Sequence, residues 1–318
     1  MISIIHQRKI WFGSSAIMVI ASVIGFLWLG LNLGIDFTGG SLLELEFFIT
    51  RPTSQQINEA LTPLGIDNVM AQPSGESGII LRFKEIDEKT HQQILETLNQ
   101  KFQPVNVNQE AGESEAGLEA KILEEKRFDS IGPTIGQELK RKTVWAIAVV
   151  LAAIICYIAW AFRKVSKPIA SWKYGLIAVI ALFHDIIITI GVFAVLGKLY
   201  GLEVNAPFVA ALLTILGYSV NDTIVVFDRT RENLIRHLGE DFEKIVQQSV
   251  NEVITRSINT SFTTLFVLFA ILLLGGQTIH SFILALIVGI AVGTYSSIFL
   301  ASPLLVTWEK FRMKRGKT

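Results

Sequence analysis

The sequence predicts a polytopic α-helical membrane protein of six transmembrane helices, with a small α+β domain inserted after the first helix. Three observations support this class. Hydrophobic residues make up 51% of the 318 residues, and the mean hydropathy is +0.48, which is above the usual range of soluble proteins. Six apolar runs are each long enough to cross a bilayer core of about 30 Å. Between the first two runs, apolar and polar residues alternate and turn residues recur, as in a small aqueous domain.

Charge and motif content exclude several classes of function. Lys plus Arg and Asp plus Glu both total 28, and no segment has the strong basic excess that nucleic-acid binding requires. The single cysteine, Cys156, lies in an apolar run and is interpreted as a packing residue. The sequence contains no HExxH, P-loop, GxSxG or Cys/His cluster with metal-ligand spacing. We therefore expect neither an enzyme, nor a cofactor, nor a metal site.

The first span also predicts the orientation of the chain. Trp11–Leu31 is uncharged and follows the basic residues Arg8 and Lys9, so the N-terminus is expected in the cytoplasm. The run is longer than the apolar core of a signal peptide, which indicates an uncleaved anchor. The other expected spans are Val144–Phe162, Gly175–Leu196, Ala206–Phe227, Ser257–Leu274 and Phe282–Val306. With this orientation every strongly basic flank is cytoplasmic, so both termini lie inside and the inserted domain is extracytoplasmic.

The inserted domain is predicted to be ferredoxin-like. Its first strand places Glu44 and Glu46 on one face, and its two helices have capping residues, Thr53 or Ser54 for the first and Asp87 for the second. The expected elements, in order, are strand Ser41–Ile49, helix Ser54–Leu64, strands Ile66–Gln72 and Gly78–Lys84, helix Asp87–Phe102 and strand Glu119–Ile131. A turn is expected at Ala111–Gly117. The order β-α-β-β-α-β is that of a split βαβ domain.

These elements divide the chain into four parts. Residues 1–33 form the N-terminus and first helix, 34–142 the extracytoplasmic domain, 143–308 the five-helix bundle and 309–318 a basic cytoplasmic tail. Within the bundle, residues 229–255 form a cytoplasmic connector. Its apolar residues recur at helical spacing, so it is expected to lie along the membrane surface or to pack beneath the bundle. A connecting role is favoured over a regulatory or partner-binding one.

Asp222, in the fourth span and directly after Asn221, is the main candidate for chemistry. A carboxylate at this depth costs about 2.5–3.5 kcal/mol and usually faces a bundle interior or a water path. The functional interpretation is a proton carrier, and the alternative is a structural carboxylate that hydrogen-bonds helices together. Arg256 opens the next span and is expected at a similar depth, where it would act as the counter-ion. The alternative interpretation of Arg256 is a residue at the membrane edge whose side chain extends to the lipid headgroups.

Other polar residues are secondary candidates. His184 and Asp185 interrupt the third span. Because adjacent helix residues point about 100° apart, we expect one to join a polar pathway while the other caps or cross-links a neighbouring helix. A structural role is as plausible for His184 and slightly favoured for Asp185. Asp228 lies at the membrane edge, where stabilisation of the helix end is favoured. Gly289 and Gly293 form a GxxxG pattern that indicates close helix packing.

Four stretches together resemble the SecF proteins of the bacterial Sec protein-export machinery. They are Gly34–Gly40 (GIDFTGG) after the first span, Ala181–Asp185, Gly217–Asn233 and Arg256–Ser261. The resemblance covers essentially the whole chain, and the Gly217–Asn233 motif is long and specific. The GIDFTGG motif is shared with the sister family SecD, which is expected to have a much larger outer region.

The resemblance implies a fold, a location and a set of partners. The fold is that of the RND superfamily, with one helix, an outer domain and five further helices, in the cell inner membrane. SecD is implied as the partner that supplies the other half of the bundle, beside the SecYEG channel, the SecA motor and a translocating preprotein. Together with SecD, the chain would use the proton-motive force to promote protein export. The alternatives are a non-conducting assembly subunit and an RND-like half-transporter for small molecules.

The resemblance also assigns residues. The family's proton-path positions in this subunit match Asp222 and Arg256, with Asp228 in the same motif as a secondary candidate. The second acidic residue of the path is expected on SecD, so this chain would not form a complete path alone. We further expect a hinge after the first helix, at Gly34, Asp36, Gly39 and Gly40, because glycine permits unusual backbone angles. Movement there would tilt the outer domain during coupling.

Overall fold

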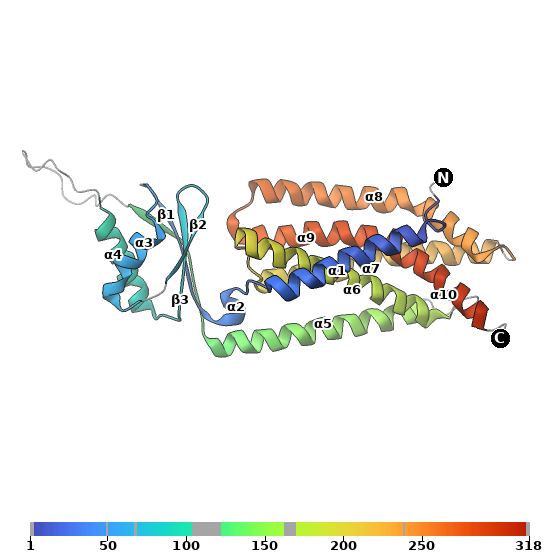
Figure 1. Ribbon diagram of the computed structural model, residues 1–318, viewed down its shortest axis with the longest axis horizontal. Helices are drawn as coiled ribbons and strands as arrows, with labels where there is room; N and C mark the ends of the chain where they lie inside the picture. Colours follow the sequence, from blue (N-terminus) through green and yellow to red (C-terminus); the bar gives the residue numbers. More distant parts are fainter. Residues whose placement is uncertain are drawn as a thin grey trace, which may run out of the picture. The chain divides into compact units, whose positions relative to one another are not determined.

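The computed structural model describes residues 3–48, 50–66, 69–103, 122–161, 170–237 and 239–315 (Figure 1). The chain divides into two compact units. The helical unit comprises Met1–Asn32 and Lys142–Thr318, and the sheet unit comprises Leu33–Arg141. Each unit has its own hydrophobic core.

Six helices among the described residues are long and apolar enough to cross a membrane, which confirms a polytopic helical membrane protein. Helix α1 precedes the sheet strands in sequence, and the other five follow them. Their bounds are α1 Arg8–Leu29, α5 Pro133–Ala161, α6 Ser171–Tyr200, α7 Ala206–Arg236, α8 Phe242–Leu274 and α9 Gln277–Ser296, which continues through the π-helical turn η2 Ser297–Ala301 into α10 Ser302–Arg315. Most extend beyond the predicted spans, because hydropathy marks only the apolar part of a helix.

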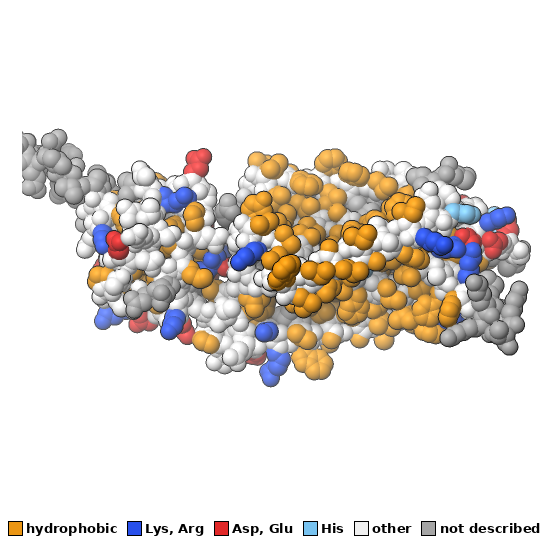
Figure 2. Space-filling model, viewed as in Figure 1, with side chains coloured by type: hydrophobic (Ala, Val, Ile, Leu, Met, Phe, Trp, Pro, Cys, Tyr) orange, Lys and Arg blue, Asp and Glu red, His pale blue; other side chains and the backbone are white. Residues whose placement is uncertain are grey.

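The helical unit buries α6, α7 and α9 most deeply. Helix α6 contacts α1, α7 and α9, and α7 also contacts α8 and α9. By contrast, few residues of α1 and α5 are fully buried, and Figure 2 shows hydrophobic side chains covering most of the visible face of this unit. That distribution is expected of a bundle whose solvent is lipid, where small residues rather than apolar burial bring helices together.

Small residues bring two helix pairs into close contact. At Gly289 of α9, an added Cβ would lie 2.2 Å from Ile215 of α7, and at Gly191 of α6 it would lie 2.3 Å from Cβ of Ser22 in α1. Gly293 meets Ser219 in the same way, at 2.9 Å. The close packing predicted from the GxxxG pattern is therefore confirmed, with α7 as the neighbour.

The predicted connector is helical, but it is not a separate surface helix. Helix α7 continues to Arg236 and α8 begins at Phe242, so the segment is the tip of a helical hairpin. The chain turns at Gly239, whose φ of +97° favours glycine. Asn233 of α7 donates hydrogen bonds to Ser249 (3.0 Å) and Glu252 (2.8 Å) of α8, which holds the two extensions together.

The sheet unit contains a four-stranded antiparallel sheet with strand order β2-β3-β1-β4. Its elements are β1 Gly40–Phe47, α3 Ser54–Leu61, β2 Met70–Ser74, β3 Gly78–Phe83, α4 Glu88–Phe102 and β4 Leu123–Ile131, with a 3₁₀ turn η1 Thr62–Leu64 after α3. This is the predicted order of strands and helices. Leu43 and Leu45 of β1 are fully buried, while the intervening Glu44 is not. The predicted turn at Ala111–Gly117 and the start of the last strand at Glu119 lie outside the described residues.

Both predicted helix caps of the sheet unit are present. Thr53 accepts a hydrogen bond from the Gln56 amide and forms a capping box with it, and Asp87 accepts one from the Thr90 amide. These side chains satisfy backbone donors that have no partner inside the helix. Sequence therefore determines where these two helices begin.

The GIDFTGG motif forms a short helix, α2 Ile35–Thr38, followed by two glycines with positive φ. Gly39 has a φ of +75° and Gly40 a φ of +120°, so both need the conformational freedom of glycine. They are also closely packed. A Cβ at Gly39 would lie 2.9 Å from Cα of Pro133, and one at Gly40 would lie 2.8 Å from the Phe83 carbonyl oxygen. The hinge assigned to Gly34, Asp36 and these glycines stays a prediction.

Candidate functional site

Asp222 lies on the buried side of α7, with only 4% of its surface exposed. Its Oδ2 atom is buried and has no hydrogen-bond partner among the described residues. Arg256 and Ser257, at adjacent positions of α8, are the groups that act on the carboxylate. The Ser257 hydroxyl is likewise buried without a hydrogen-bond partner in the described part of the chain. The carboxylate therefore has a cation and a hydroxyl nearby but no formed hydrogen bond at Oδ2.

A stripe of exposed polar residues borders Asp222. Asn221 of α7 and Arg256, Asn259 and Thr260 of α8 are all exposed, although α7 and α8 qualify as membrane spans. We call these four residues the polar stripe. Polar side chains at membrane depth rarely face lipid, because each would lose its hydrogen bonds to water. The stripe therefore marks a surface that a water path or a second protein is expected to cover.

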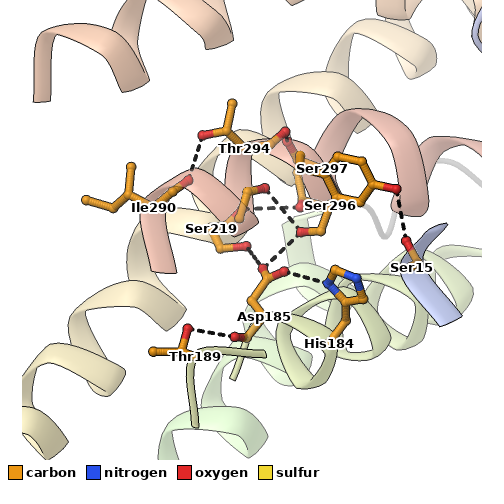
Figure 3. A network of polar contacts seen from close by, with 12 residues as sticks. Ser15, His184, Asp185, Thr189, Ser219, Ile290, Thr294, Ser296 and Ser297 are labelled. Carbon is orange, nitrogen blue, oxygen red and sulfur yellow. Dashed lines mark hydrogen bonds and ion pairs between the residues drawn. The ribbon is translucent and has the colours of Figure 1, made fainter. Parts of the chain in front are cut away.

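Asp185 of α6 has the opposite environment. It is fully buried, and its Oδ2 accepts hydrogen bonds from Ser219 of α7 at 2.6 Å and Ser296 of α9 at 2.9 Å. Its Oδ1 lies 3.0 Å from Nδ1 of His184. Figure 3 shows these groups converging on one carboxylate from three helices. A carboxylate that accepts several hydrogen bonds from the protein ties its donors together.

The network continues from Asp185 toward α1. The His184 ring stacks against Tyr295 with the ring centroids 6.1 Å apart. The Tyr295 hydroxyl lies 2.5 Å from the Ser14 hydroxyl and 3.3 Å from that of Ser15, the second of which is drawn in Figure 3. Four helices, α1, α6, α7 and α9, thus contribute to one buried polar network.

A π-helical turn follows this network directly. Ser296 ends α9, and residues Ser297–Ala301 adopt π geometry before α10 begins. The Ser302 hydroxyl donates to the Ser297 carbonyl at 3.1 Å, five residues earlier. Single π turns inside α-helices often occur at functional sites. The sequence predicts one continuous sixth span here and contains no signal for the turn.

The structure separates the predicted site residues into two groups. Arg256 of α8 acts electrostatically on the Asp222 carboxylate of α7, whereas His184 and Asp185 contact each other directly. Asp185 accepts hydrogen bonds from α7 and α9, so it cross-links neighbouring helices, as expected for one residue of the pair. The two side chains also contact each other, which their separation of about 100° on the helix did not predict. The expectation that His184 joins a polar pathway stays a prediction.

Asp228 joins neither group. It is exposed and lies 3.5 Å from Arg231 on the same helix. The expected role at a helix end is wrong, because α7 continues to Arg236. Asn221 is exposed and belongs to the polar stripe.

Sequence reasoning missed the other members of the buried network, which are Ser14, Ser15, Ser219, Tyr295 and Ser296. Each is an ordinary residue in an apolar run, and nothing in the local pattern connects α7 with α9. No group of three His, Cys, Asp or Glu side chains in the described ranges is arranged to hold a metal ion.

Comparison with known proteins gives consistent results. The family model "Protein export membrane protein SecD/SecF, C-terminal" matches residues 113–311, and the "SecD/SecF GG Motif" model matches residues 29–47. The protein translocase subunit SecF of Thermobaculum terrenum is 41% identical, over 97% of this chain and 94% of that protein. SecF of Anaerolinea thermophila is 38% identical, over 97% of this chain and 94% of that protein.

Solved structures agree. The crystal structure of SecDF from Thermus thermophilus superposes with a TM-score of 0.77 at 29% identity, covering 96% of this chain. The chain spans 38% of the length of that SecDF chain. SecDF in its super-membrane-facing form gives a TM-score of 0.65 at 30% identity, over 99% of this chain and 39% of that one. Family models, near-full-length relatives and solved structures thus confirm the resemblance: the chain belongs to the SecF family, auxiliary membrane subunits of the Sec protein translocase that act in protein export.

Proposed function

We propose that this chain works with SecD to use the proton-motive force for preprotein export, with Asp222 as the proton-carrying residue and Arg256 as its counter-ion. The observation that carries the proposal is the buried Oδ2 of Asp222, which has no hydrogen-bond partner among the described residues. A carboxylate satisfied by several fixed donors resists protonation, whereas one with an oxygen that no donor reaches, beside a cation, can exchange a proton when that charge moves. Arg256 stays charged at all relevant pH values, so its approach and withdrawal would control the exchange.

A second membrane protein is needed to complete this site. The polar stripe, which includes Asn221 and Arg256, is exposed in a span that should face lipid. SecD is the proposed partner, because the solved SecDF chain is more than twice as long as this one and carries both parts. Its own acidic residue would face Asp222 and complete the proton path. Through SecD the chain would act beside the SecYEG channel and SecA, on a translocating preprotein.

The sheet unit is proposed as an extracytoplasmic, ferredoxin-like domain. The strand order β2-β3-β1-β4, read from the other edge as 4-1-3-2, with helices α3 and α4 between strands, supports this class. The basic flanks support an orientation with both termini in the cytoplasm of a multi-pass inner-membrane protein. The order of one helix, domain and five helices supports an RND-type layout. Gly34–Gly40 would then transmit helix movement to the domain.

The test is Asp222→Asn in the full chain, co-expressed with SecD and reconstituted with the export machinery. We expect normal recovery of the complex but loss of the export stimulated by the proton gradient, because the amide cannot carry the proton. Asp228→Asn is the matched control, since it removes an exposed carboxylate of the same helix, and it should retain stimulation. Undiminished stimulation in Asp222→Asn would rule out the carrier role. A parallel loss of complex and activity would support the assembly-subunit alternative instead.

A further inference from the structure

We propose that the Asp185 cluster, defined as His184, Asp185, Ser219 and Ser296, is a second proton-binding site that is separate from Asp222. The proton binds Oδ2 of Asp185, and the Ser296 hydroxyl then turns from the carboxylate to the Gly293 carbonyl. The inference extends the proposed function. It rests on that proposal only for the statement that this proton exchange serves protein export. The proton site itself follows from the geometry of the cluster.

In the observed arrangement the cluster is satisfied by an ionised Asp185. All three contacts to the carboxylate come from groups able to donate, namely the Ser219 and Ser296 hydroxyls and Nδ1 of His184. An ionised carboxylate only accepts hydrogen bonds, so it can satisfy all of them at once. Yet the hydrogen-bond partners of the Asp185 side chain in the described part of the chain are His184, Ser219 and Ser296, none of which is a lysine or an arginine. The ionised cluster with a neutral His184 would therefore hold one net negative charge in a fully buried place, which is unfavourable.

Proton uptake removes that charge, and the geometry decides which atom receives the proton. His184 is a poor recipient, because its Nε2 is buried and has no hydrogen-bond partner among the described residues. A proton there would create a buried N–H donor with no acceptor, which is costly. Oδ2 of Asp185, in contrast, lies beside two hydroxyls, and a hydroxyl can rotate to accept as well as donate. The carboxylate thus takes the proton and becomes a neutral acid, and no other bond is formed or broken.

Ser296 has a second acceptor ready for this change. Its Oγ lies 2.9 Å from Oδ2 of Asp185 and 3.1 Å from the Gly293 carbonyl oxygen. When Asp185 is ionised, the Ser296 hydrogen points to Oδ2. When Asp185 is protonated, the acid donates to Oγ of Ser296, whose own hydrogen turns to the Gly293 carbonyl. Both states keep every donor satisfied, which is what an exchangeable site requires.

The position of the switch connects it to helix packing. The donors to Asp185 come from α7 and α9 as well as α6, and Ser296 is directly followed by the π-helical turn η2. Protonation replaces two bonds to a charged acceptor by weaker bonds to a neutral acid, so the three helices are held less tightly. The other titratable groups nearby are Tyr295 of α9, which stacks on His184, and Asp222 of α7, three positions after Ser219. From α1 the described residues contribute the Ser14 and Ser15 hydroxyls, the Trp11 carbonyl and the Trp11 ring, none of which carries a charge.

Infrared difference spectroscopy of the full chain in lipid nanodiscs tests the proposal, with spectra recorded between about pH 5 and about pH 8, where folded proteins are usually most stable. A neutral carboxylic acid has a carbonyl band that the ionised form lacks. We expect a titrating band that is lost in Asp185→Asn and retained in Asp222→Asn. A set of titrating bands that Asp185→Asn leaves unchanged would overturn the proposal, because Asp185 would then keep one protonation state throughout.

Ser296→Ala tests the hydroxyl switch while keeping the carboxylate, and it also serves if Asp185→Asn does not fold. We expect the Asp185 band to move to higher frequency, because the acid loses a hydrogen-bond partner. Ser297→Ala is the matched control, since Ser297 is equally buried but donates to the Thr294 carbonyl, and it should leave the band in place. An unchanged band in Ser296→Ala contradicts the switch. Since no export is measured here, failure of this test and failure of the Asp222→Asn export test are distinguishable.

Discussion

Asp185 and Asp222 are the same residue type, both buried in neighbouring membrane helices, with 0% and 4% of their surfaces exposed. Asp185 is reached by donors from its own and two other helices, whereas Oδ2 of Asp222 has no hydrogen-bond partner in the described ranges. The environment of Asp185 is thus complete within this chain. That of Asp222 is incomplete, and it opens onto exposed polar residues that need a covering partner.

This difference shows that a single subunit can contain both a carboxylate whose environment is complete and a carboxylate whose environment is completed by another protein. In a membrane, hydrogen bonds between helices contribute to their association, so a carboxylate with three donors helps define one packing of α6, α7 and α9. A carboxylate with an oxygen that no donor reaches contributes less to packing, but that oxygen stays available for a proton or for groups of another polypeptide. The predictions below test this division.

The largest expected effect is on stability. Asp185→Ala leaves the Ser219 hydroxyl and a histidine N–H without their acceptor in a buried place, while the Ser296 hydroxyl keeps the Gly293 carbonyl. We therefore expect a loss of about 3 kcal/mol or more. Asp222→Ala removes a carboxylate with no hydrogen bond at Oδ2 and should change stability by less than about 1 kcal/mol. Thermal unfolding of the two purified variants in the same detergent measures both. Equal losses would show that the two sites do not differ as described.

Packing around the two sites should differ in the same direction. A Cβ at Gly293, beside the Asp185 cluster, would lie 2.9 Å from Cβ of Ser219 and 3.5 Å from Oδ2 of Asp185. Gly293→Ala should therefore destabilise the bundle by about 1–3 kcal/mol. Gly217 of α7 has no atom within 4 Å of its added Cβ, so Gly217→Ala should be neutral or stabilising by up to about 1 kcal/mol. Unfolding midpoints provide the comparison. A destabilising Gly217→Ala would contradict the open space around this position of α7.

The polar stripe should affect the behaviour of the chain only when SecD is present. Asn221→Leu replaces an exposed polar residue of the stripe by an apolar one of similar size. We expect no loss of stability in the isolated chain and a loss of about 0.6–2 kcal/mol in association with SecD, the size of a hydrogen bond between membrane helices. Thr214→Val is the control, because the Thr214 hydroxyl already donates to Ala210 of its own helix. Quantitative co-purification measures the effect, and equal recovery of both variants argues against the stripe as the contact.

The smallest effect concerns a third aspartate, which lies in the sheet unit and faces water. Hydrogen bonds from the Thr90 side chain and backbone lower the pKa of Asp87 below its usual value. A lowered folded-state pKa means that the stabilisation is complete above the ordinary pKa and is lost as pH falls through the folded one. Asp87→Asn keeps a good helix cap but has no charge, so unfolding of its sheet unit should lose this acid-dependent component. If the stability of the unsubstituted protein and of Asp87→Asn falls identically with decreasing pH, Asp87 is not the source of this component.

Much of the molecule follows from the sequence. Hydropathy predicts six spans because a bilayer core imposes a minimum apolar length, and the described residues form six such helices. Period-two alternation and cap residues predict the elements of the sheet unit, since Thr53 and Asp87 act within a few residues of themselves. The motif around Asp222 identifies the family, and an acidic residue in an apolar run is visible without any structure because its cost is local.

Only the tertiary structure decided which polar groups meet. Ser219 and Ser296 are 77 positions apart in the printed numbering, and no local pattern indicates that both donate to Asp185. The π-helical turn after Ser296 and the turn at Gly239 likewise depend on how the helices pack. The sequence by itself determined where buried charge must exist, because transfer into lipid is costly for each residue alone. Tertiary structure decided whether that charge is satisfied, because hydrogen bonds between helices depend on distances of a few ångströms that no single helix contains.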